Sequence, residues 1–300
     1  MAHDLTERTP GSTRQSTRRT SSGTPTGDPL RPIPSRTVGF TGDTAVQALS
    51  GGTYSTEIKP GWDIGGNANG GYLLSIAVRA MIDAARRPDP VSVTGHYLRP
   101  GRPGAATVNT EVVKQGRRFT TATGALAADG SRLLQVLGTF GDVSTPLGPE
   151  RVDSAPPDLP PPDICIPVEP GETFPPPFMG RVELRLHPED AGFANGAPSG
   201  EPRVRGWFRL RNDEPIDTVG LILATDAFPP TAFNARLPVA WTPTVELTAH
   251  VRARPAPGWL RCAFVTRFVT GGFLEEDGEI WDQTGRLVAQ SRQLALIPTG

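Results

Sequence analysis

The sequence predicts an α+β fold with two tandem units, each a central helix wrapped by an antiparallel β-sheet. Three observations carry this prediction. The first two are that an apolar helical segment at residues 70–85 precedes four strand-like segments, and that another at residues 216–228 precedes four more. The third is that short sequences of the first set recur in the second, as in a duplicated domain. A chain of 300 residues has room for two such units.

Residues 70–85, GGYLLSIAVRAMIDAA, form a strongly apolar helix. Apolar side chains surround it on nearly all sides, so it must be buried in protein or lipid. The run is shorter than the roughly 20 residues that a membrane span requires, which favours burial inside the protein. Arg79, Asp83 and Arg87 form its polar stripe, at a spacing where opposite charges on one helix can pair.

The composition excludes several classes of function. A net charge of −1 provides no basic surface for nucleic acid or an anionic membrane. Cys165 and Cys262, the only cysteines, lie far apart and match no metal or redox motif, which favours a reducing, cytoplasmic setting. Residues 1–36, rich in Ser, Thr, Arg, Pro and Gly, are predicted to be a disordered tail without the apolar segment of a secretory signal.

The first unit is predicted at residues 37–145. A strand at 53–58 precedes the glycine-rich loop 61–71, which matches neither a P-loop nor a GxGxxG motif. Free N–H groups at the start of the helix suit an oxygen anion, although a plain turn and helix cap explain the loop equally well. After the helix, strands are predicted at 91–98, 105–115, 118–127 and 131–140, separated by Pro-Gly, Gln-Gly and Asp-Gly turns.

Residues 146–178 are predicted to be an extended linker, because a run such as PPDLPPPD cannot enter the interior of a sheet. The second unit, at residues 179–300, begins with strands at 181–186 and 204–210 and continues with the helix at 216–228. Its last four strands are predicted at 245–251, 259–269, 274–282 and 287–297.

The internal repeat can be followed residue by residue. VTGHYLRP at 93–100 matches LTAHVRARP at 247–255, which aligns His96 with His250. Gln135 and Gln290 fall at matching places in a later strand of each unit. We therefore expect the two histidines to have the same structural role, on the surface of the sheet.

The segments GGNANGGYLLSIAVRA, DPVSVTGHYLRPGRPG, LATDAFPP, WTPTVELTAHVRA and GRLVAQSRQLAL resemble the acyl-CoA thioesterase II family and its thioesterase-like relatives. The resemblance spans nearly all of residues 53–298 except the linker. It implies the hot-dog fold in its tandem form, the double hot-dog. It further implies an acyl-CoA substrate, no metal or redox cofactor, and assembly into a homo-oligomer, a dimer or larger.

The resemblance also implies three residues that hold and activate a water molecule. By position these are Asp226 in TDAFPP, Thr244 in PTVEL and Gln293 in AQSRQLAL. Gln290 is the alternative glutamine, and since side chains alternate along a strand, only one of the two can face the site. The face of Gln293 carries apolar and small side chains, where an amide needs a reason, and this favours Gln293.

The first unit does not repeat this set of residues. Gly138 falls near the place of Gln293, and Pro90 near that of Thr244, which predicts one working site per chain. The loop before the first helix is expected to add substrate contacts, partly through backbone N–H donors. These predicted substrate-binding residues are Asn69, Gly70, Gly71 and Tyr72.

Each site residue also has a plain structural interpretation. Asp226 could be an exposed residue at a helix end, Thr244 an ordinary edge threonine, and Gln293 a satisfied core amide. The acidic run of residues 275–277 is most simply a solvated hairpin. No GxSxG motif occurs and the four histidines show no ligand spacing, which argues against a serine hydrolase and a metal site.

The predicted reaction is hydrolysis of an acyl-CoA thioester to a free fatty acid and coenzyme A, with the acyl chain in an apolar channel between helix and sheet. Two other functions stay open. A non-catalytic acyl-CoA or acyl-carrier binding protein would keep the channel without the reaction. A hot-dog dehydratase or hydratase is the other, although it normally needs a histidine near the central helix, and neither predicted helix contains one.

Overall fold

The first half of the chain folds as a long helix and the strands that surround it. The structure is a computed structural model that describes residues 39–145, 148–172 and 174–297, so the predicted tail at 1–36 lies outside the described residues. The elements of this half are α1 (Phe40–Asp43), β1 (Gln47–Ala48), β2 (Thr53–Ile58), β3 (Asp63–Ile64), β4 (Asn67–Ala68), α2 (Gly70–Ala85), β5 (Asp89–Tyr97), β6 (Gly104–Gln115), β7 (Thr120–Ala128) and β8 (Ser131–Gly141). Helix α2 has the predicted bounds, and the predicted strands of this half agree within two residues.

The second half repeats this order with a shorter helix. Its elements are β9 (Ile166–Pro167), η1 (Pro177–Gly180), β10 (Val182–Leu186), η2 (Pro188–Asp190), η3 (Gly192–Asn195), β11 (Arg203–Leu210), η4 (Arg211–Asp213), α3 (Thr218–Ala224), η5 (Thr231–Phe233), β12 (Thr244–Val251), β13 (Leu260–Val265), β14 (Val269–Thr270), β15 (Phe273–Trp281) and β16 (Leu287–Leu296).

Two predictions for this half were wrong in extent. The predicted helix 216–228 is confined to α3, because Asp217 caps its start and Phe228 stands before two prolines, where helical backbone is disfavoured. The predicted strand 259–269 is divided into β13 and β14. There the Thr266 hydroxyl donates to the carbonyl of Glu275 at 2.6 Å, and this side-chain bond accompanies the break in the ladder.

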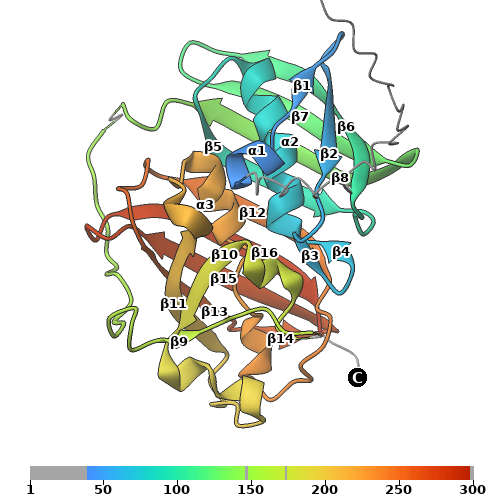
Figure 1. Ribbon diagram of the computed structural model, residues 1–300. Helices are drawn as coiled ribbons and strands as arrows, with labels where there is room; N and C mark the ends of the chain where they lie inside the picture. The colour runs from blue at the N-terminus through green and yellow to red at the C-terminus, as the bar shows by residue number, and fades with distance from the viewer. Residues whose placement is uncertain (1–38, 146–147, 173, 298–300) are drawn as a thin grey trace, which may run out of the picture. The chain divides into compact units, whose positions relative to one another are not determined.

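All strands except β3 and β4 form one antiparallel sheet, and the helices α2 and α3 pack on it (Figure 1). Neighbours follow the order β1-β2-β6-β7-β8-β5-β12-β16-β15-β13-β11-β10-β9, with β14 beside β15. Strands β3 and β4 form a separate small hairpin. Strand β9 comes from the predicted linker and stands at the edge of the sheet, where a proline costs no ladder hydrogen bond.

The two halves meet at the antiparallel pair β5 and β12. Thr94 lies directly opposite Thr248, with 2.8 Å between their hydroxyl oxygens, so an approximate two-fold axis passes between them. Around this axis each histidine of the repeat pairs with the matching glutamine. These pairs are His96 with Gln135 and His250 with Gln290. The register thus confirms the internal repeat predicted from the sequence.

Helix α2 lies tightly against the sheet. Leu74, Ile76 and Met81 are fully buried, and burying a side chain of this size contributes roughly 1.5–3 kcal/mol. The close approach requires glycine in the sheet: a Cβ on Gly124 would lie 2.6 Å from the Sδ of Met81. No helix in the described part of the chain is both long and apolar enough to cross a membrane.

The spacing of Arg79, Asp83 and Arg87 predicted ion pairs along α2, but these side chains do not pair with one another. Arg79 instead donates to Asp217 at 2.6 Å, and Asp83 accepts from the Tyr54 hydroxyl at 2.8 Å. Arg87 donates to the carbonyl of Gly116. Because the helix is surrounded by protein, its charged groups find partners on neighbouring elements before they find each other.

Candidate active site at the start of α2

The N-terminus of α2 is held by an asparagine cap and a glycine turn. Gly65 and Gly66, both at positive φ, close the β3–β4 hairpin that leads into the helix. The Oδ1 atom of Asn69 then accepts from the backbone N–H of Tyr72 at 2.9 Å, which caps α2. This leaves the amide nitrogen of Asn69 free to reach another element.

That amide reaches Asp226, which stands just after α3. The Nδ2 atom of Asn69 donates to the backbone carbonyl of Asp226 at 2.8 Å and to its Oδ2 at 3.1 Å. The N–H of Gly71 donates to the same Oδ2 at 2.7 Å. The carboxylate therefore sits at the positive end of the α2 dipole, as anions at helix N-termini do.

The environment of Asp226 sets its acidity. Burial raises its pKa to about 6, while hydrogen bonds from Gly71, Asn69 and Gln293 act in the opposite direction. The residue as a whole is only partly buried. A carboxylate of this kind is ionised at neutral pH and basic enough to accept a proton from water.

Gln293 and Thr244 lie together on the face of the sheet that carries the helices. The Nε2 atom of Gln293 donates to the Oγ1 of Thr244. A β-bulge between Thr244 and Glu246 makes this possible, because it turns Thr244 to the same face as Gln293, opposite Ala295. The structure thus brings together all three residues that the family resemblance implied. Gln293 links them, because it contacts Thr244 and its side chain also lies close enough to Asp226 to lower the pKa of that carboxyl.

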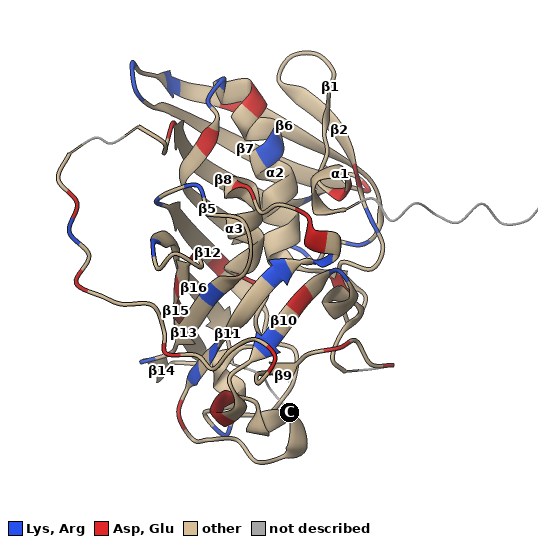
Figure 2. Ribbon diagram, turned by 60° about the vertical axis from the view of Figure 1, so that its left-hand side comes forward, with Lys and Arg blue, Asp and Glu red and all other residues tan. Residues whose placement is uncertain are grey.

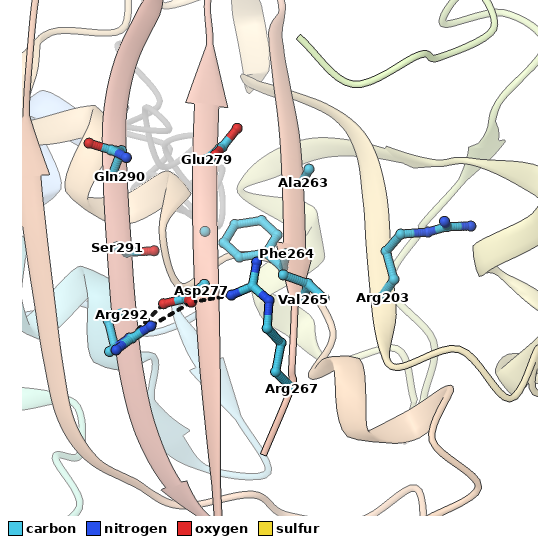
Figure 3. A pocket seen from close by; sticks show the side chains of 11 residues that line it. Arg203, Ala263, Phe264, Val265, Arg267, Asp277, Glu279, Gln290, Ser291 and Arg292 are labelled. Atoms are coloured by element: carbon cyan, nitrogen blue, oxygen red, sulfur yellow. Dashed lines mark hydrogen bonds and ion pairs between the residues drawn. The ribbon is translucent and has the colours of Figure 1, made fainter. Parts of the chain in front are cut away.

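Gln290 points away from this group. It accepts from the Nε of Arg252 at 3.1 Å in an exposed position. It also lines a hollow of about 500 Å³ on the opposite face of β13, β15 and β16 (Figure 3). There Asp277 is paired with both Arg267 and Arg292, so its carboxylate has no free role. The two glutamines therefore occupy opposite faces of one strand.

Glu276 is a second carboxylate near the site, and the prediction that residues 275–277 form a solvated hairpin was wrong for it. It is only 8% exposed, stands directly opposite Gln293 in β15, and accepts from the N–H of Thr231 at 2.8 Å. Burial raises its pKa to about 7, and the nearby Asp226 adds to the rise. Strand alternation with the buried Leu274 and Ile280 is the sequence signal that could have placed it inside.

The predicted substrate-binding residues have different surroundings. Asn69 and Gly71 direct their donors at Asp226, and Gly70 lies between Asp226 and the ring of Tyr97. Tyr72 is fully buried and stacked on Trp62, with its hydroxyl donating to Asp43 and accepting from Lys59. It has no surface left for a ligand, so the substrate contact predicted for Tyr72 is corrected to a structural role.

One group of possible metal ligands occurs in the described residues, at His187, Glu189 and Asp190. Arg205 donates to Asp190 at 2.8 Å and to Glu189 at 2.9 Å, so arginine already neutralises both carboxylates. Burial and the same arginine lower the pKa of His187. This cluster is therefore a salt-bridge network. Elsewhere in the view of Figure 2, basic and acidic residues are intermixed along the strands and loops.

Comparison with protein families places both halves in one group. The family model for the acyl-CoA thioesterase N-terminal domain matches residues 58–141, and the model for the acyl-CoA thioesterase C-terminal domain matches residues 149–297. Among proteins known from sequence, an uncharacterized protein of Mycobacterium tuberculosis (strain H37Rv) is 29% identical over 270 residues, covering 82% of this chain and 91% of its own length.

Solved structures give the same result. A protein of Thermobifida fusca YX, assigned as a thioesterase II, is 32% identical with a TM-score of 0.78, and the match covers 87% of this chain and 97% of that one. A hot-dog protein of unknown function from Alicyclobacillus acidocaldarius is 21% identical with a TM-score of 0.77, over 87% and 98% of the two chains. The predicted α+β double hot-dog fold is thereby confirmed.

Proposed function

This chain belongs to the acyl-CoA thioesterase family, and on that premise we propose that it hydrolyses an acyl-CoA thioester at Asp226. The observation that carries the proposal is the position of this carboxylate: it is held by the N–H of Gly71 and the amide of Asn69, next to the Gln293–Thr244 pair. No arginine or lysine pairs with it among the described residues. A carboxylate held by neutral donors keeps the basicity that a salt-bridged one loses.

The reaction uses Asp226 as the general base. The amide of Gln293 and the hydroxyl of Thr244 hold a water molecule, and Asp226 takes its proton as the water oxygen attacks the carbonyl carbon. The carbon–sulfur bond then breaks, and the thiolate of coenzyme A takes the proton back from Asp226. The products are a carboxylic acid and free coenzyme A.

The acyl chain is expected to contact apolar side chains next to Thr244. Val239 and Trp241, 48% and 47% exposed, precede this residue in the chain, and exposed apolar groups beside a site are typical of binding surfaces. Within this proposal the units keep the boundaries 37–145 and 179–300, with one site made from the helix start of the first and the strands of the second.

The test is release of free thiol from a panel of acyl-CoA substrates, short to long. We expect the wild-type protein to cleave some of them, and Gln293→Ala to lower kcat by on the order of 10²-fold, as loss of a positioned hydrogen-bond donor does. Gln290→Ala is the matched control on the opposite face and should behave like wild type. Tight acyl-CoA binding without thiol release, for every chain length, would instead support the non-catalytic binding protein.

A further inference from the structure

Attack on a thioester places negative charge on the carbonyl oxygen, and this oxygen needs a hydrogen-bond donor. The loop before α2 was expected to supply one. Its donors are already engaged, since the N–H of Gly71 and the amide of Asn69 both point at the carboxylate of Asp226. The donor for the carbonyl oxygen must therefore come from another element.

Tyr97 is the side chain in position to supply it. It follows Val93 and Gly95 on the face of β5 that carries α2, at the end of the strand nearest the start of that helix. A Cβ built on Gly70 would lie 2.9 Å from the Oδ2 of Asp226 and 3.0 Å from the Cε1 of Tyr97. The carboxylate and the phenol ring thus flank the same glycine.

The hydroxyl of Tyr97 is buried and has no hydrogen-bond partner within the described part of the chain, and no other hydroxyl there shares this condition. Leaving a buried hydroxyl unpaired is unfavourable, so the position needs a compensating gain. Burial, with the charges of Asp226 and Glu246 added, raises the pKa of Tyr97 well above its ordinary value. The group therefore stays protonated and remains a donor.

The repeat provides an internal comparison. The register that pairs Thr94 with Thr248 makes Val251 the counterpart of Tyr97 in the second unit, and Val251 is a buried core residue. An apolar side chain thus satisfies the fold at this place in the strand. The phenol hydroxyl exists only at the end of the helix pair where Asp226 stands.

We propose that the hydroxyl of Tyr97 donates a hydrogen bond to the thioester carbonyl oxygen and stabilises the oxyanion formed when water attacks. This inference rests on the proposed function. No covalent bond to Tyr97 forms or breaks: the carbonyl π electrons move to oxygen as the water oxygen adds to carbon, and they return as the carbon–sulfur bond breaks. Tyr97 is then a fourth catalytic residue beside Asp226, Thr244 and Gln293.

The experiment is Tyr97→Phe in the full-length protein, with thiol release measured on the best substrate of the wild type. The ring and its packing remain, so we expect kcat to fall on the order of 10²-fold, with KM within about twofold and no loss of melting temperature. The midpoint of the pH–rate profile should remain at the pKa of Asp226, because the hydroxyl of Tyr97 donates a hydrogen bond but transfers no proton in the reaction.

Tyr54→Phe is the matched control. Tyr54 is a buried tyrosine whose hydroxyl donates to Asp83 at 2.8 Å, away from Asp226. The Tyr54→Phe variant should have a lower melting temperature and an unchanged kcat, which is the reverse of the result expected for Tyr97→Phe. A Tyr97→Phe variant as fast as an active wild type would overturn the role of Tyr97 alone, whereas a wild type that cleaves no thioester would overturn the proposed function and this role with it.

Discussion

The two ends of the α2–α3 helix pair are built alike and carry opposite chemistry. At one end the cap residue of α2, Asn69, reaches Asp226 beyond the end of α3. At the other the cap residue of α3, Asp217, reaches Arg79 of α2 at 2.6 Å. The first contact leaves a carboxylate without a counter-ion in the described structure, and the second is an ion pair.

The same contrast holds for the residues around each contact. The strand register and the spacing from each helix cap define four pairs of equivalent positions, one position from each unit. The polar residue of each pair lies at the Asp226 end. The pairs are Asp226 with Val78, Thr244 with Pro90, Gln293 with Gly138, and Tyr97 with Val251. A glutamine would not fit at Gly138, where even a Cβ would lie 2.9 Å from the ring of Phe140.

A second carboxylate, Asp89, lies near the other end, and its surroundings show how a structural carboxylate differs. Asp89 is 2% exposed and accepts from the Thr218 hydroxyl at 3.1 Å, from the N–H of Val143, and from Arg254. Both of its oxygens have partners and an arginine supplies the positive charge. Among the described residues Asp226 has neutral donors only, and this distinguishes a base from a structural anchor.

The largest expected effect is that of Asp226→Asn on turnover. We expect kcat to fall by about 10³-fold or more, because the general base is lost while size and most hydrogen bonds are kept. Since the folded-state pKa of Asp226 is raised, its ionisation destabilises the fold as the pH rises from about 4 through about 6. The variant should therefore melt no lower than wild type at pH 7. Thiol release and thermal unfolding measure both, and retained activity would remove the distinction between the two ends.

Asp89→Asn is the mirror experiment at the other end. The amide would lose the pairing with Arg254 and turn a donor toward Thr218 or Val143, so we expect a loss of about 2 kcal/mol in the free energy of unfolding. Turnover per folded molecule should stay within about twofold of wild type. Denaturant unfolding and thiol release on the same samples decide this, and a large drop in kcat would mean that the second end also takes part in catalysis.

The smallest expected effect is the change of the rate with pH, which tests whether Asp226 and not Asp89 is the base. With a pKa of about 6 for Asp226, the ionised fraction and hence kcat/KM should rise about tenfold between pH 5 and pH 7 and then level off. Asp89→Asn should leave the midpoint in place. A profile that stays flat across this range would contradict Asp226 as the base.

Local sequence pattern was sufficient for most of the long elements and for the repeat. Helix α2 was predicted with its observed bounds because sixteen residues with almost no polar face can form only a buried helix. The strands followed from turn residues between apolar segments, and the equivalence of His96 with His250 and of Gln135 with Gln290 followed from the duplicated sequence. Alternation placed Gln293 and Gln290 on opposite faces of one strand, and the apolar and small side chains on the face of Gln293 favoured that residue.

Contacts between distant segments were decided only by the tertiary structure. Tyr72 was predicted to bind substrate, yet its hydroxyl is enclosed by Asp43 and Lys59, which lie in other parts of the chain. Glu276 and Tyr97 face the site because β15 pairs with β16, which carries Gln293, and β5 pairs with β12, which carries Thr244. Composition and spacing record what each segment prefers by itself, whereas the partner of a buried polar atom depends on which segments the folded chain brings within hydrogen-bond distance.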